Sequence, residues 1–117
     1  MTLSLDALAA YPQQVITIEE PFVKKRQEFT GVRLADLLTK AGIPESAKIN
    51  TIALNEYAYA APATQFTDSD ALIAYRVDGH DIDITEGGPV RIVFPEGSPQ
   101  FSDLDAWTWS LAQIVQE

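Results

Sequence analysis

The chain has 117 residues, of which 46% are hydrophobic and 21% are charged, enough for one compact domain and too few for two. Eight Lys and Arg against 17 Asp and Glu give a formal net charge of −9, which repels nucleic acid and anionic membranes, so we expect neither as a partner. Cysteine is absent and His80 is the single histidine, which excludes disulfides and thiolate sites and argues against a zinc site.

No apolar run approaches the roughly 20 residues of a membrane span, so we expect no membrane insertion. The first ten residues lack the basic region and the long apolar region of a signal peptide. The sequence is therefore compatible with a cytoplasmic protein and with an exported protein whose signal peptide has been removed.

The first part of the chain predicts a short helix followed by a hairpin. Ser4 can cap a helix over Leu5–Ala10, and the β-branched run Val15–Ile18 predicts a strand. Gln27–Thr30 begins the returning strand after the basic turn Lys24–Arg26, which we interpret as a solvated turn rather than a binding patch.

The strongest helix signal covers Val32–Ala41. Leu34, Leu37 and Leu38 recur at spacings of three and four and form one apolar stripe. Gly42 suits the left-handed position that follows a helix, so we expect the helix to end there.

The middle of the chain is organised around the stretch Thr51–Pro62. A buried strand over Ile49–Leu54 ends in the polar corner Asn55–Tyr57, and a second extended run follows over Ala58–Ala61. An amide, a carboxylate and a phenol at a strand end share one rim of a sheet, where ligands often bind. The alternative is a turn that only needs polar residues, with the tyrosine packed as a half-buried aromatic.

The second half predicts one helical turn over Ala63–Asp70 and strands over Leu72–Val77 and Val90–Phe94. The segment Pro95–Asp105 is expected to be irregular, and loops of that length inside a compact domain are more often functional than shorter ones. We therefore treat this loop as a candidate functional surface.

A final strand is expected over Ala106–Val115. Trp107 and Trp109 alternate with smaller residues, and this period of two places both indoles on one face. At least one indole is expected in the core, while the other could offer its ring to a flat ligand. The sequence thus predicts a single domain over residues 1–117, of the α+β class, with a mixed β-sheet and a few short helices.

No catalytic constellation stands out. A Ser-His-Asp triad would need His80, which lies in a turn between Asp78 and Asp81 with no elbow-like serine to pair with it. A calcium loop over Asp78, Asp81 and Asp83 lacks the glycine and terminal glutamate of an EF-hand. We therefore expect no enzymatic activity and no metal site.

Five short motifs follow one another between Phe29 and Leu111. They are Phe29–Leu38 (FTGVRLADLL), Asn55–Ala58 (NEYA), Ala74–Gly79 (AYRVDG), Gly88–Pro95 (GPVRIVFP) and Trp107–Leu111 (WTWSL). In this order and spacing they resemble the molybdopterin-binding domain of the sulfite oxidase family, over nearly the whole chain from Val15 onward. The resemblance implies the fold of that domain, which holds the pyranopterin of the molybdenum cofactor.

In that family one cysteine thiolate, upstream of the Gly-Val-x-Leu helix, binds the molybdenum. The corresponding stretch Val15–Glu28 contains no cysteine, and the final third lacks the basic cluster that would hold the cofactor's phosphate. This combination resembles the small, cysteine-less periplasmic pterin-binding proteins of the PruR type. These bind a free pterin and signal it to the periplasmic region of a membrane-bound diguanylate cyclase or phosphodiesterase.

The resemblance implies a non-catalytic, periplasmic pterin sensor that contains no molybdenum and acts on cyclic di-GMP metabolism. Recognition of a pterin requires an aromatic or apolar wall and a few fixed polar groups. The site residues that we expect are Asn55, Glu56 and Arg76 for the polar edge, and Phe29, Tyr57, Trp107 and Trp109 for the wall.

Three alternatives stay open. Arg76 could form a surface ion pair with a nearby acid instead of binding the ligand. The protein could be a degenerate molybdopterin-dependent oxidoreductase domain or an accessory subunit that docks on a catalytic partner. It could also be a protein-interaction module that binds no small molecule.

Overall fold

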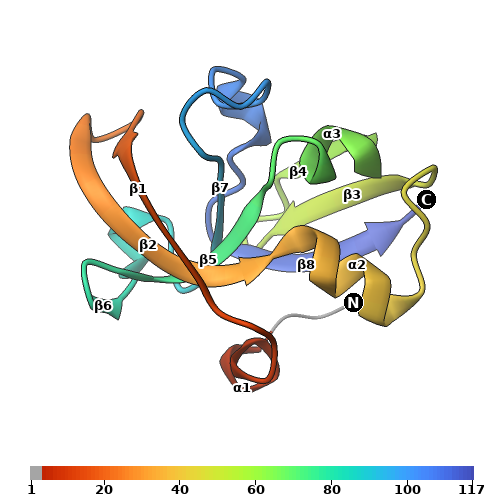
Figure 1. Ribbon diagram of the computed structural model, residues 1–117, viewed down its shortest axis with the longest axis horizontal. Helices are drawn as coiled ribbons and strands as arrows, with labels where there is room; N and C mark the ends of the chain where they lie inside the picture. The colour runs from red at the N-terminus through yellow and green to blue at the C-terminus, as the bar shows by residue number, and fades with distance from the viewer. Residues whose placement is uncertain (1–3) are drawn as a thin grey trace.

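The computed structural model describes residues 4–117 as two β-sheets with short helices around them (Figure 1). The larger sheet has the order β1-β2-β5-β6, with β7 also paired to β5, and the smaller has the order β4-β3-β8. The strands are β1 (Gln14–Glu20), β2 (Lys25–Arg33), β3 (Lys48–Ala53), β4 (Ala58–Pro62), β5 (Leu72–Val77), β6 (His80–Asp81), β7 (Arg91–Val93) and β8 (Leu111–Gln116). The helices are α1 (Leu5–Ala9), α2 (Leu34–Ala41), α3 (Ala63–Thr67) and the 3₁₀ turns η1 (Ile84–Glu86) and η2 (Leu104–Ala106).

The long β1–β2 hairpin extends beyond the rest of its sheet, on the left of Figure 1. Its strands pair from Gln14 opposite Gly31 to Glu20 opposite Lys25. At Gly31 the register of β2 against β5 shifts, and a Cβ there would lie 2.1 Å from the carbonyl oxygen of Ile73. Glycine is required at this bulge because the two backbones approach so closely.

Helix α2 confirms the predicted apolar stripe, because Leu34, Leu37 and Leu38 are all buried. The helix begins at Leu34 rather than at the predicted Val32, since Val32 pairs with Ile73 in the ladder between β2 and β5. Its end is as predicted, with Gly42 in the left-handed conformation at φ 72°.

The predicted α+β class with few short helices is confirmed. The β-structure forms two sheets, and every strand pairing that the structure describes is antiparallel. The last strand begins at Leu111 and not at Ala106, because the preceding residues run beside β7 instead of pairing with β3. The backbone amide of Ile92 donates to Thr108 at 3.0 Å, and that of Ser110 donates to the Gly87 carbonyl at 2.6 Å.

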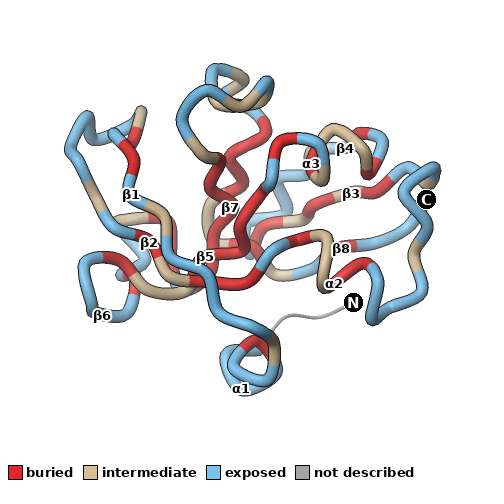
Figure 2. The backbone as a smooth tube through the Cα atoms, viewed as in Figure 1, coloured by how far each residue is buried: buried red, intermediate tan, exposed pale blue. Residues whose placement is uncertain are grey.

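The core lies between the two sheets and under α2, and Figure 2 shows its buried residues concentrated along β5 and β7. Phe66 and Phe94 stack at 6.3 Å, and the ring of Trp107 meets Phe94 edge-on at 5.5 Å. A buried hydrogen bond of 2.9 Å joins the hydroxyls of Thr51 and Thr108 across the core. No helix within residues 4–117 is long and apolar enough to cross a membrane.

Candidate functional site

A pocket of about 300 Å³ opens where the corner after β3 faces the segment between η2 and β8. The tip of the β1–β2 hairpin contributes one further aromatic ring to it. We call this the aromatic pocket, and its lining residues are Phe22, Asn55, Tyr57, Leu104, Asp105, Trp107 and Trp109.

The polar corner is a tight turn that holds Asn55 and Tyr57 at the rim. The side-chain oxygen of Asn55 accepts the backbone N–H of Tyr57 at 3.1 Å, while Glu56 takes the left-handed conformation at φ 71°. The Tyr57 hydroxyl donates to the backbone carbonyl of Asp105 at 2.9 Å. Burial raises the pKa of Tyr57, and the charges of Asp105 and Asp103 raise it further, so the phenol remains a donor.

The two indoles line the pocket from one side, in agreement with the predicted period of two. The ring of Phe22 contacts both edge-on, at 6.3 Å from Trp107 and 5.2 Å from Trp109. Trp107 is buried, and its indole N–H donates to the carbonyl of Phe101 at 3.1 Å. Trp109 packs against Gly87, where a Cβ would lie 2.7 Å from the indole, so no other residue fits that position without displacing the ring.

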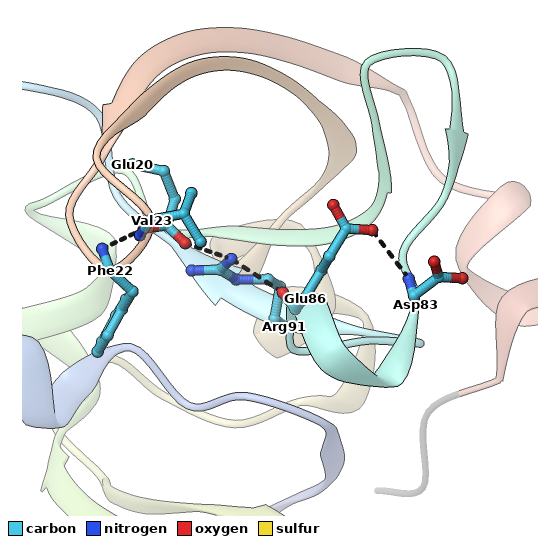
Figure 3. A network of polar contacts seen from close by, with 6 residues as sticks. All are labelled: Glu20, Phe22, Val23, Asp83, Glu86 and Arg91. Carbon is cyan, nitrogen blue, oxygen red and sulfur yellow. Dashed lines mark hydrogen bonds and ion pairs between the residues drawn. The ribbon is translucent and has the colours of Figure 1, made fainter.

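A buried arginine packs against these rings, and Figure 3 shows it with its polar partners. The guanidinium of Arg91 lies 5.0 Å from the ring centre of Trp109, 5.8 Å from that of Trp107 and 5.2 Å from that of Phe29. It donates to a carboxylate oxygen of Glu20 at 2.8 Å and to the backbone carbonyl of Glu86 at 3.2 Å. Burial lowers the pKa of Arg91, and the hydrogen bond and charge of Glu20 oppose that shift.

Glu20 connects this arginine to the rim of the pocket. Its second carboxylate oxygen accepts the backbone N–H groups of Phe22 and, at 3.0 Å, of Val23, as Figure 3 shows. Both Glu20 and Arg91 are 1% exposed. The carboxylate therefore fixes the hairpin tip, and with it the Phe22 ring, to the buried cation beside the indoles.

Four of the seven predicted site residues meet in the aromatic pocket: Asn55, Tyr57, Trp107 and Trp109. Phe29 is 1% exposed and belongs to the core beneath Arg91. Arg76 lies at the far end of β5 and forms an exposed ion pair with Asp81 at 3.4 Å, the alternative role for this residue. Glu56 is exposed beside the pocket without lining it. The structure thus does not bring these three into the site.

The prediction from sequence also did not identify Phe22, Glu20 and Arg91, and it included Asp105 only as part of the loop Pro95–Asp105 and not as a pocket residue. A signal for Arg91 was available, because it is the one charged residue within the apolar run Val90–Phe94. A cation inside a buried strand requires a buried partner. Nothing local to the sequence indicates that the partner is Glu20, 71 residues away.

The residues present fit the organic part of a molybdopterin better than its metal. Four aromatic side chains, an amide and a carboxylate around one pocket suit a flat heterocycle with polar edges. The sequence contains no cysteine to ligate molybdenum. Within residues 4–117 no group of three or more His, Cys, Asp or Glu side chains could hold a metal ion.

Comparisons with known proteins agree with this fold. Residues 20–98 match the family described as oxidoreductase molybdopterin binding domain. The crystal structure of the sulfane dehydrogenase SoxCD from Paracoccus pantotrophus is similar, with a TM-score of 0.72 and 19% sequence identity. The alignment covers 97% of this chain and 34% of that chain, so this chain spans about a third of it.

No curated protein matches the sequence. The structural likeness, at its low sequence identity, shows the fold alone. The family match covers more than half of the chain and confirms the resemblance to the sulfite oxidase type of domain. This chain belongs to the oxidoreductase molybdopterin binding domain family.

Proposed function

We propose that this domain binds a free pterin, without molybdenum, in the aromatic pocket and acts as a binding protein rather than an enzyme. One observation carries the proposal: a family defined by molybdopterin binding is represented here by a chain with an aromatic pocket and no cysteine. The volume of about 300 Å³ lies at the lower end of the range for small-molecule sites, which suits a bicyclic ring.

The lining residues have separable roles toward such a ring. The aromatic side chains of Phe22, Trp107 and Trp109 supply flat apolar contact and exclude water from the ring faces. Asn55 uses its side-chain oxygen within its own turn, and its amide nitrogen has no hydrogen bond within residues 4–117. That nitrogen can therefore donate to a ring nitrogen or carbonyl of the ligand.

Protein purified from its native host tests the proposal directly. After denaturation, we expect a released fluorescent pterin in stoichiometric amount, and elemental analysis should find no molybdenum. Stoichiometric molybdenum in the purified protein would contradict the proposal.

The role of Asn55 has a matched pair of variants. Asn55→Asp keeps an oxygen for the Tyr57 N–H and removes the amide donor, whereas Asn55→Ala removes both. Loss of one hydrogen bond to the ring should weaken pterin binding by about 1 kcal/mol, or roughly fivefold, in both variants. Unchanged calorimetric affinity in Asn55→Asp, with the fold intact, would remove Asn55 from the site.

Binding alone would then carry the function, through a surface that a partner recognises differently when the pterin is bound. The loop Pro95–Asp105 is our candidate surface, because its Phe101 carbonyl accepts the Trp107 indole N–H and its Leu104 and Asp105 line the pocket. The proposed partner is the periplasmic region of a membrane-bound diguanylate cyclase or phosphodiesterase. This partner and a periplasmic location are inferred from the resemblance to the PruR-type proteins.

Thermodynamic linkage tests the signalling role. A pterin that strengthens partner binding must itself bind more tightly when the partner is present, by the same factor. Pterin titrations with and without a saturating amount of the partner's periplasmic region measure that factor. Equal affinities in the two titrations would refute signalling while leaving pterin binding in place.

A second candidate is a degenerate oxidoreductase domain or accessory subunit. It is favoured by the structural similarity to a dehydrogenase chain, about a third of which this chain spans. Co-purification of this protein with a second, molybdenum-containing chain would support it. Isolation of a pterin complex without such a chain would argue for the sensor.

A further inference from the structure

We propose that Asp105 determines which ring the aromatic pocket accepts, by receiving two adjacent N–H donors from the ligand edge. A pterin carries such a pair in its 2-amino group and the neighbouring N3–H. The inference rests on the proposed function and deepens it, because it assigns a specific edge of the ligand to a specific residue.

The position of Asp105 is fixed by its backbone. Its carbonyl accepts the Tyr57 hydroxyl at 2.9 Å, which ties the η2 turn to the polar corner across the mouth of the pocket. Asp105 is one of the residues that line the pocket, and after burial its charge is the next cause that raises the pKa of Tyr57. The residue is held at the rim while its carboxylate is exposed.

The carboxylate of Asp105 is not engaged by the fold. Within residues 4–117 it forms no hydrogen bond and no ion pair, and only its backbone carbonyl is used. Asp103, two residues earlier, differs in this respect, because its carboxylate accepts the Tyr59 hydroxyl at 3.0 Å. Of these two neighbouring acids, one is committed to the structure and the other is available to a ligand.

The chemistry of a carboxylate matches the pterin edge. Its two oxygens are acceptors only, and they can receive two parallel N–H groups at once. The other residues that line the pocket are aromatic, apolar or, in Asn55, a neutral amide, and none of them carries a charge. Asp105 is therefore the charged acceptor of the pocket, placed beside aromatic walls that can hold a flat ring in register with it.

An aromatic pocket with a carboxylate at its rim also suits a quaternary ammonium ion. Here the guanidinium of Arg91 already lies over both indoles, at 5.0 and 5.8 Å from their centres. The two rings thus already contact one cation, which weakens their attraction for a second. The geometry favours a neutral ring with donor groups over a cationic guest.

Two probes that differ at one position test the inference. Pterin is 2-amino-4-oxopteridine, and lumazine is the corresponding 2,4-dioxo compound, in which an acceptor oxygen replaces the 2-amino donor. Wild-type protein should prefer pterin. In Asp105→Asn the amide can accept from N3–H and donate to the 2-oxo group, so the preference should reverse.

The exposure of Asp105 determines how large a change in pterin affinity we expect. Because Asp105 lies at a solvent-exposed rim, water competes for its hydrogen bonds, and we expect roughly a tenfold loss of pterin affinity in Asp105→Asn. Lumazine affinity should rise or stay constant in the same variant. Asp105→Ala should lose pterin affinity similarly without gaining any for lumazine.

Asp103→Asn is the matched control, since it removes the same charge two residues away and should leave the pterin preference unchanged. Calorimetric titration measures the affinities of the wild type and the three variants for pterin, lumazine and choline. If wild type binds pterin and Asp105→Asn keeps the wild-type preference, or Asp103→Asn shifts it equally, the inference fails and pterin binding stands. If wild type binds neither pteridine, or binds choline more tightly than pterin, the proposed function fails as well.

Discussion

The buried pair of Glu20 and Arg91 predicts a large and non-additive effect on stability. Their side chains are 1% and 2% exposed and join at 2.8 Å, so either residue alone would leave an uncompensated charge in the core. The variants that test this are Glu20→Gln, Arg91→Met and the double variant, all close in volume to the native side chains.

Removing one partner of a buried ion pair costs about 3–5 kcal/mol, a large part of the about 5–15 kcal/mol that stabilises a typical domain. The loss of stability in Glu20→Gln should lie at the upper end of this range. Two guanidinium nitrogens of Arg91, Nε and Nη2, already have no hydrogen-bond partner, and the amide nitrogen of the new glutamine could face the third, Nη1. Arg91→Met should cost less, because Glu20 would still accept the backbone N–H groups of Phe22 and Val23.

Urea unfolding followed by tryptophan fluorescence measures the cycle, because Arg91 lies over both indoles. The double variant should lose about 2 kcal/mol less free energy of unfolding than the two single variants lose together, because it leaves neither charge buried without its partner. Asp81→Asn is the control at an exposed pair with Arg76, where about 0–1 kcal/mol is expected. Single effects that add within about 0.5 kcal/mol would refute the coupling.

Two further predictions concern the residues around the aromatic pocket. Burial and the hydrogen bond to Asp103 raise the pKa of Tyr59 from 10.0 to about 12, so the folded state holds this proton more tightly than the unfolded state. The stabilisation is complete below pH 10 and is lost as pH rises toward about 12, and the urea midpoint of wild type should fall across that window more steeply than that of Tyr59→Phe. Equal slopes would contradict this assignment. Gly87→Ala should destabilise by about 1–2 kcal/mol from its φ of 93° alone, and should weaken pterin binding because its Cβ would displace Trp109. Unchanged affinity and indole emission would show that the ring is not held by Gly87.

The parts of the fold that could be predicted from sequence are those specified by local patterns. The leucine stripe of α2, the left-handed Gly42 and the polar corner at Asn55 each depend on residues a few positions apart. The period of two also predicted that the side chains of Trp107 and Trp109 lie on the same side of the chain. This prediction applies even though both residues precede β8, because the side chain of Thr108 between them points the other way and bonds to Thr51.

The parts that could not be predicted depend on contacts between distant segments. Phe22 is in a hairpin turn, and only the register of β1 and β2 brings its ring to the two indoles. The choice between arginines shows the same limit. Arg76 and Arg91 both lie in predicted strands, but Arg76 faces the short edge strand β6, whereas Arg91 enters the core. Periodicity does not distinguish an edge from the interior.

The structure also shows what the stretch does in which the sulfite oxidase family has its metal-binding cysteine. Glu20 lies within the stretch Val15–Glu28, where the resemblance places the cysteine of the sulfite oxidase family, and both of its oxygens are engaged. One oxygen binds Arg91, and the other accepts two backbone N–H groups of the hairpin tip. Its carboxylate holds the hairpin tip that bears Phe22, and Asp105 lines the same pocket from the η2 turn. A single substitution to cysteine at Glu20 would leave Arg91 unpaired and release Phe22, so it would disturb the pocket instead of converting it into a molybdenum site.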